Sequence, residues 1–244
     1  MLQPPVALVT GSAVRIGAEV VRHLHTAGYC VIIHFRQSEI QARELVDELT
    51  KIREKSAFCI QADLSNDDDL KKLALRAHEQ WGRIDLLVNN ASSFFPTPLG
   101  SCTLGQWDEL IASNAKAPFF LSQLLLPELK KVNGSIVNII DIHANAPLKN
   151  HTVYCMAKSA LSMMTLSLAK ELAPEIRVNG VAPGAVLWPK PEDEMLESEK
   201  QTILASVPLN RLGKATEIAE AVHFLASSKY ITGQIIAVDG GRSL

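Results

Sequence analysis

Short apolar runs alternate with longer amphipathic stretches along the whole chain. The runs are rich in valine and isoleucine and are apolar almost throughout. Strands of this kind are buried on both faces, as they are in a parallel sheet. The predicted strands cover residues 6–10, 30–35, 57–62, 86–89, 135–140, 177–181 and 234–238.

The amphipathic stretches between these runs have the apolar spacing of helices. They cover residues 15–27, 39–51, 67–81, 103–131, 153–173 and 216–227. The alternation of strand and helix predicts an α/β fold, a Rossmann-type doubly wound sheet of seven parallel strands. Because no linker, repeat or low-complexity segment divides the chain, residues 1–244 are predicted to form a single domain.

The stretch from 187 to 213 interrupts this alternation. It begins with Leu187 and Trp188, and a run rich in prolines and acids follows. Ligands of open α/β sheets bind at the carboxyl ends of the strands, and this stretch follows such an end. It is therefore predicted to be a lid over a binding site. The alternative is a solvated surface helix and loop.

Composition narrows the function classes. Twenty-four basic against 26 acidic residues exclude a globally basic nucleic-acid binder. No apolar run approaches the length of a membrane span, so no membrane partner is expected. The four cysteines lie far apart without a C-x-x-C pair, which predicts reduced thiols in the cytoplasm and neither a disulfide nor a metal site.

The first predicted strand runs into a turn that suits a dinucleotide. Gly11 and Gly17 flank small residues there, and the start of the next helix favours an anion. The full G-x-G-x-x-G motif is absent. The prediction of a dinucleotide site therefore rests mainly on the position of the turn in the first βαβ unit.

The end of the second strand indicates which dinucleotide binds. Sites that prefer NAD place an acid about 20 residues beyond the glycine turn. Here the chain reads Arg36-Gln37-Ser38, with no acid before Glu39. Arg36 can pair with a 2′-phosphate and Ser38 can donate to it, which predicts NADPH. The alternative is an exposed arginine on a loop.

Tyr154 and Lys158 lie four residues apart, on one face of a predicted helix. An ammonium near a phenol favours the phenolate, so we expect Lys158 to lower the pKa of Tyr154 and make it a better proton donor. Such pairs also occur by chance on surface helices, and the assignment therefore depends on the motifs around the pair.

Those motifs resemble the short-chain dehydrogenase/reductases, in order and spacing, over essentially the whole chain. They are Thr10-Gly11, Arg15-Ile16-Gly17, Asp63-Leu64, Asn89-Asn90-Ala91, Asn114, Tyr154-x-x-x-Lys158, Pro183-Gly184 and Val238-Asp239-Gly240-Gly241. The resemblance implies that Asp63 and Leu64 border the adenine and that Asn90 shapes the centre of the cofactor pocket. It also implies that Asn114 orders a relay water with Lys158, and that Tyr154 donates the proton. The further cofactor-binding residues that it implies are Gly11, Arg15, Ile16, Ala91, Ser92, Lys158, Pro183 and Gly184.

Three departures from the common family pattern narrow the chemistry. Arg15 stands at the usual middle glycine, Asp141 at the serine 13 residues before the tyrosine, and Ser92 at the last glycine of N-N-A-G. A serine hydroxyl can donate to a developing alkoxide, whereas an ionised aspartate would repel it. An aspartate beside Tyr154 suits protonation of a ring nitrogen during C=N reduction. Phe94 can stack on a flat heterocycle.

With these departures the chain resembles the pteridine reductases, most specifically in NNASSFFPTPL at 89–99. That resemblance implies NADPH-dependent reduction of pterins, with dihydrofolate as a further substrate. Arg15, Ser92, Phe94 and Tyr154 would bind the pterin, and Trp188 would form a wall of its pocket. Asp141, Tyr154, Lys158 and Asn114 would be the catalytic residues.

Two other functions remain open. A ketoacyl-carrier-protein reductase shares Val207-Pro208-Leu209-x-Arg211-x-Gly213, although Asp141 argues against ketone reduction. A non-catalytic NADP(H) sensor has no need of Tyr154. Separately, Asp141 could cap a turn, Phe94 could be a core aromatic, and Arg15 could only neutralise phosphates.

The helix predicted at 153–173 is apolar on nearly every side, so it is buried inside the domain or against another subunit. The family resemblance favours the second explanation and implies a homotetramer. His143 and His151 are interpreted as loop residues outside the site.

Overall fold

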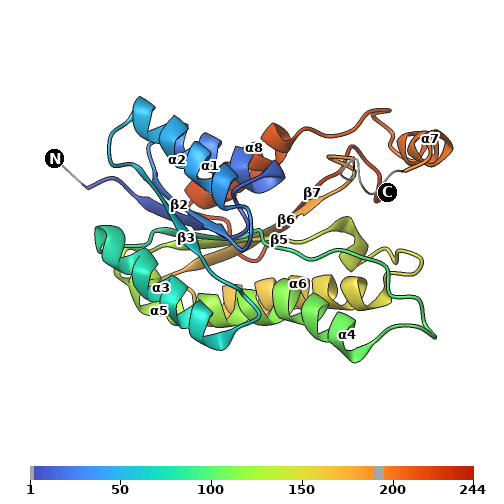
Figure 1. The fold of residues 1–244 in the computed structure, drawn as a ribbon, viewed down its shortest axis with the longest axis horizontal. Coiled ribbons are helices and arrows are strands. Elements are labelled where there is room, and N and C mark those ends of the chain that lie inside the picture. The colour runs from blue at the N-terminus through green and yellow to red at the C-terminus, as the bar shows by residue number, and fades with distance from the viewer. Residues whose placement is uncertain (1–2, 189–194) are drawn as a thin grey trace.

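A computed structural model describes residues 3–188 and 195–244, so part of the predicted lid lies outside the described residues. Seven strands form one parallel sheet in the order β3-β2-β1-β4-β5-β6-β7 (Figure 1). They are β1 (Val6–Val9), β2 (Cys30–Phe35), β3 (Ala57–Gln61), β4 (Leu86–Asn89), β5 (Ser135–Ile139), β6 (Arg177–Pro183) and β7 (Ile235–Val238). The predicted seven-stranded, doubly wound α/β fold is confirmed, and the strand order reverses between β1 and β4, where such folds bind ligands.

Helices cover both faces of the sheet (Figure 1). One face carries α1 (Arg15–Thr26), α2 (Glu39–Ile52) and α8 (Ala215–Ser227). The other carries α3 (Asp67–Trp81), α4 (Leu104–Ile111), α5 (Ala117–Lys131) and α6 (Thr152–Glu171). Each layer encloses its own apolar cluster against the sheet, which is why the strands are apolar on both sides.

The bounds of α3 follow from local chemistry. The Asn66 side chain caps its start by accepting from the amides of Asp68 and Asp69, and three acids occupy the first turn. Gly82 ends the helix in the left-handed conformation, with φ of 70°. The structure therefore reproduces the predicted range 67–81.

The predicted helix 103–131 is interrupted. Between α4 and α5 the chain forms a π-helical segment, Ala112–Lys116, which contains Asn114. A π turn takes one more residue per hydrogen bond than an α-helix does, and it often marks a functional site. The apolar pattern did not reveal it because the residues on either side of the segment keep helical spacing.

α6 is not buried all round within one chain. Tyr154, Lys158 and Leu161 are buried, whereas Met156, Met163 and Leu166 are 48%, 61% and 41% exposed. Burial inside the domain, one of the two explanations for the apolar composition of this helix, is therefore wrong for these three side chains.

Within the described residues, the structure contains no helix that meets the length and hydropathy needed to cross a membrane.

Candidate active site

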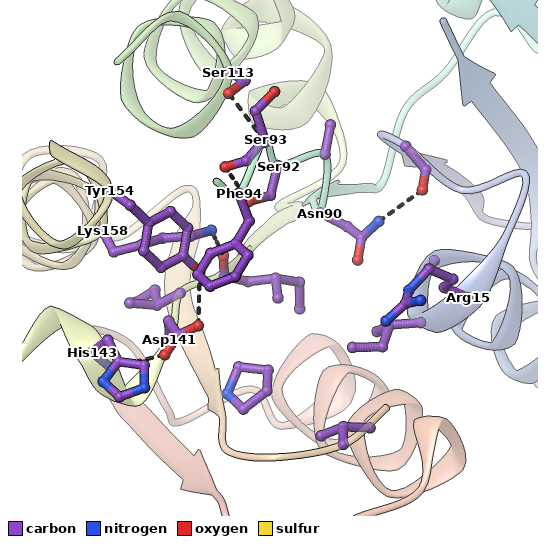
Figure 2. Close-up of a pocket in the computed structure, with 18 of the residues that line it drawn as sticks. Arg15, Asn90, Ser92, Ser93, Phe94, Ser113, Asp141, His143, Tyr154 and Lys158 are labelled. Carbon is purple, nitrogen blue, oxygen red and sulfur yellow. Dashed lines mark hydrogen bonds between the residues drawn. The ribbon is translucent and has the colours of Figure 1, made fainter. Parts of the chain in front are cut away.

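A cleft of about 830 Å³ opens at the carboxyl ends of the strands. It contains 15 of the residues predicted for the site: Gly11, Arg15, Ile16, Arg36, Asp63, Leu64, Asn90, Ala91, Ser92, Phe94, Asp141, Tyr154, Lys158, Pro183 and Gly184. Figure 2 shows Arg15 on one side of this cleft, with Tyr154, Lys158 and Asp141 on the other. Gln37, Ser38, Asn114 and Trp188 were also predicted for the site but are not part of this lining.

Close backbone approach shapes the turn after β1. Gly11 has φ of +60°, and a Cβ there would lie 2.8 Å from the Cα of Ala91. A Cβ on Gly17 would lie 2.5 Å from the carbonyl oxygen of Gly11. Any larger residue would force the turn to shift, so both glycines are needed to hold it open beside the cleft.

The N-terminus of α1 is suited to an anion. Its N-cap residue, Val14, makes no side-chain hydrogen bond to the first turn, and that turn holds no acid. The first amides are therefore available to a phosphate, and the helix dipole favours negative charge there. A pyrophosphate fits this end of the cleft.

Arg15 occupies a backbone conformation that favours glycine, with φ of 56°. A non-glycine residue held there costs about 1–3 kcal/mol. This explains why a glycine is usual at the position, and it indicates that the side chain has a use. Its Nη2 donates to the carbonyl oxygen of Trp188 at 3.2 Å, so the backbone of Trp188 lies near the cleft although its indole does not line it.

A smaller pocket continues from the cleft at the end of β2. It is lined by Arg36, Gln37, Gln61, Ala62, Asp63, Asp69 and Glu109. Arg36 Nη1 lies 4.0 Å from the Glu109 carboxylate across this pocket, and both side chains are about half exposed. Hydrogen bonds from Ser65 hold the pKa of Asp63 below its usual value, so Asp63 carries its charge here. Among the residues that line this pocket, Arg36 is the cation and Asp63, Asp69 and Glu109 are the acids.

Asp141 and Tyr154 form a direct pair. The phenolic oxygen of Tyr154 donates to Asp141 Oδ2 at 2.7 Å, and the backbone amide of His143 donates to Asp141 Oδ1 at 2.8 Å (Figure 2). Asp141 therefore caps the short 3₁₀ segment Ile142–Ala144 and also binds the phenol. The interpretation of Asp141 as a cap is confirmed, and its role as a functional carboxylate stays a prediction.

The pKa of Tyr154 moves in the direction opposite to the sequence-based expectation. Burial raises it well above its usual value, and the charge and hydrogen bond of Asp141 raise it further. Lys158 does not offset this because its Nζ lies 5.7 Å from the ring centre and donates to the carbonyl of Ile139 at 2.9 Å. Burial lowers the pKa of Lys158 to about 8. The expectation that Lys158 makes Tyr154 more acidic is wrong for this structure.

Asn114 lies behind the cleft. Its Oδ1 accepts from the Ser92 hydroxyl at 2.6 Å, and its Nδ2 donates to the carbonyls of Ser93 and Leu110. The π-helical segment thereby fixes the loop that follows β4. The role of Asn114 in a water relay with Lys158 stays a prediction.

Phe94 is 56% exposed and stands in the cleft, so it is not a core aromatic. It stacks on His151, with ring centres 4.7 Å apart and planes 14° from parallel, and it meets Tyr154 edge-on at 4.8 Å. His143 and His151 both line the cleft, although they were interpreted as residues outside the site. Their place between β5 and α6 was the available signal, because Asp141 and Tyr154 flank the same stretch.

The chain is similar to known reductases along nearly its whole length. A family model described as enoyl-(acyl carrier protein) reductase matches residues 11–243. Pteridine reductase 1 of Leishmania tarentolae is 40% identical, over 98% of this chain and 96% of that protein. The 3-oxoacyl-(acyl-carrier-protein) reductase FabG of Staphylococcus aureus is 35% identical over 96% of each. Ketoacyl reductase 2 of the granaticin polyketide synthase from Streptomyces violaceoruber is 33% identical, over 99% and 97%.

Proposed function

The chain belongs to the short-chain dehydrogenase/reductase family of oxidoreductases, and we propose that it uses NADPH to reduce dihydropterins to tetrahydropterins. Dihydrofolate is proposed as a second substrate. The observation that carries the proposal is the 2.7 Å hydrogen bond between Tyr154 and Asp141, at the position where most of the family has a serine. The similarity to a pteridine reductase supports the same substrate class.

Asp141 favours a C=N substrate over a ketone. A carbonyl that gains hydride becomes an alkoxide, and it needs a neutral or cationic donor beside it. A carboxylate repels that charge. A ring nitrogen that gains a proton becomes neutral, so a carboxyl group beside the proton donor can serve it.

Tyr154 is the proton donor in the proposed reaction, and Asp141 assists it through their hydrogen bond. Bound NADPH supplies the hydride that enters a ring carbon. Tyr154 gives its phenolic proton to the adjacent ring nitrogen, which balances the charge of that hydride. A proton from solvent then restores the phenol, and Asp141 Oδ2 holds the hydroxyl in place by accepting its hydrogen bond.

Neighbouring residues position this chemistry. The buried ammonium of Lys158 lies 5.7 Å from the centre of the Tyr154 ring and donates to the Ile139 carbonyl, and Lys158 is proposed to hold the nicotinamide ribose. Phe94 offers an exposed aromatic face to a planar bicycle. Arg15 and the first amides of α1 hold the phosphates, with Asp63 and Leu64 beside the adenine.

A direct comparison of substrates tests the proposal. NADPH oxidation is measured with dihydrobiopterin, dihydrofolate and an acetoacetyl thioester at equal concentrations. We expect turnover with the dihydropterin and none above background with the thioester. Turnover with the thioester alone would favour the ketoacyl reductase activity that the 35% identical relative carries in its name. Tight NADPH binding without any turnover would instead support a sensor.

Arg36→Ala tests the choice of dinucleotide. We expect Kd for NADPH to rise about tenfold or more, because the 2′-phosphate loses its cationic partner, while Kd for NADH changes less than about twofold. Fluorescence titration of each cofactor measures both constants. Arg43→Ala is the matched control, since Arg43 is an exposed arginine on α2 that pairs with Glu39. Equal losses for NADPH and NADH would remove Arg36 from 2′-phosphate recognition.

We also propose a cytoplasmic homotetramer in which the exposed side chains of α6 face a second subunit. Half-exposed Phe119 and Phe120 on α5 extend the same kind of apolar surface. Residues 187–213 are proposed as the lid. Met195 and Ile203 from this segment line the cleft, and Ile203 belongs to α7 (Glu197–Ala205), which has no buried residue.

A further inference from the structure

We propose that His34, near the end of β2, is a positioning residue for the dinucleotide. It fixes the Gly11 turn to the segment after β3 as a neutral imidazole that carries its proton on Nε2. The inference rests on the cofactor part of the proposed function and does not depend on the identity of the reduced substrate.

The geometry determines the tautomer of His34. The backbone amide of Gly11 donates to Nδ1 at 2.9 Å, so Nδ1 must carry a lone pair. Nε2 lies 3.1 Å from the carbonyl oxygen of Ala62, which can only accept, so Nε2 must carry the proton. Both ring nitrogens are thereby satisfied in a side chain that is 2% exposed.

The neutral form required by this geometry is also the stable one. Burial lowers the pKa of His34 to about 4, although Ala62 and the charge of Asp63 oppose the shift. The imidazole therefore stays uncharged near neutral pH, and Nδ1 remains able to accept from Gly11.

His34 accepts from the backbone amide of Gly11, and Asn90 donates to its carbonyl oxygen. Asn90 Nδ2 donates to the carbonyl oxygens of Thr10 and Gly11, at 2.8 Å and 3.0 Å. With both its amide and its carbonyl engaged by side chains, Gly11 is fixed in its left-handed conformation before any phosphate arrives. Ordering the turn then adds little to the entropic cost of binding.

The second hydrogen bond extends this effect across the cofactor cleft. Ala62 directly precedes Asp63 and Leu64, which line the cleft and which the proposed function places beside the adenine. His34 thus connects the segment that faces the pyrophosphate with the segment that faces the adenosine. We infer that it sets the spacing between them, so its loss weakens cofactor binding without touching the proton transfer.

His34→Leu tests the role directly, because leucine fills similar volume and makes neither hydrogen bond. We expect Kd for NADPH, measured by fluorescence titration, to rise about tenfold. At saturating NADPH, kcat should stay within about twofold of the unmodified enzyme. His34→Asn keeps an acceptor near the position of Nδ1, and it should recover most of the lost affinity.

His25→Leu is the matched control. His25 is another 2% exposed histidine, on α1, and its Nε2 bonds to the Ser56 hydroxyl outside the cleft. The His25→Leu variant should have lower thermal stability than the unmodified enzyme and an unchanged Kd for NADPH. An unchanged Kd in folded His34→Leu, an equal rise in His25→Leu, or a loss confined to kcat would overturn the proposal.

The tautomer can be checked without a variant. In the ¹⁵N-labelled wild-type chain at pH 7, His34 should show an acceptor-type Nδ1 and a protonated Nε2. An imidazolium or the opposite tautomer would contradict the proposal even if every variant failed to fold.

Discussion

Tyr154→Phe is expected to lower kcat for dihydropterin reduction by about 10²–10⁴-fold, the usual contribution of a positioned proton donor. The ring and its edge-on contact with Phe94 remain, but the hydroxyl that donates to Asp141 is gone. Because the change removes an interaction with the reacting nitrogen, Kd for NADPH should stay within about threefold. Steady-state kinetics and fluorescence titration on the same preparation separate these two effects.

Tyr230→Phe provides the background for that measurement, since Tyr230 is fully exposed and is not among the residues that line the cleft. It should leave both kcat and Kd unchanged. If Tyr154→Phe retained normal turnover, the proton would have to come from another group, and the pairing with Asp141 would be structural only.

Asp141→Asn is expected to lower kcat by about 10²-fold and to change the titration of Tyr154. The carboxylate disfavours a neighbouring phenolate, and it therefore contributes to the raised pKa of Tyr154. Removing its charge should move that pKa down, so phenolate absorbance appears at lower pH than in the unmodified enzyme. Subtracting the titration of Tyr154→Phe removes the signal of the other tyrosines.

Asp141→Ser sharpens the interpretation because it restores the residue that most of the family has at this position. It should lose dihydropterin turnover as Asp141→Asn does, while turnover of an acetoacetyl thioester rises above background. If the pKa of Tyr154 stayed unchanged in both variants, burial alone would account for it. Unchanged dihydropterin turnover would remove Asp141 from the proposed mechanism.

Most of the fold could be predicted because the buried strands are recognisable in the sequence as short apolar runs. Their predicted bounds lie within two residues of those of β1 to β7. The motif residues could be placed for a related reason: parallel strands bring their carboxyl ends to one edge of the sheet, so Gly11, Asn90 and Asp141 converge although they are far apart in sequence.

What the sequence could not supply depends on distances and solvent exposure. Spacing of four residues places Tyr154 and Lys158 on one face of α6, but it does not reveal that Lys158 Nζ turns to the Ile139 carbonyl. The direction of the Tyr154 pKa follows from that geometry and from burial. His34 was likewise unremarkable in sequence, because its two hydrogen bonds join segments that only the folded sheet brings together.

The contacts made by the π-helical segment at Ala112–Lys116 depend on the number of residues in that segment. A π turn holds one residue more than an α turn, so deleting one residue there would let Leu104 to Lys131 wind as an uninterrupted α-helix and would change the direction of the side chains within the segment. Asn114 would then swing away from the hydroxyl of Ser92, and the loop after β4 would lose its anchor. A more regular helix would thus hold the loop after β4 less firmly. A relative whose sequence aligns with a gap within these five residues is expected to lack this contact between Asn114 and Ser92.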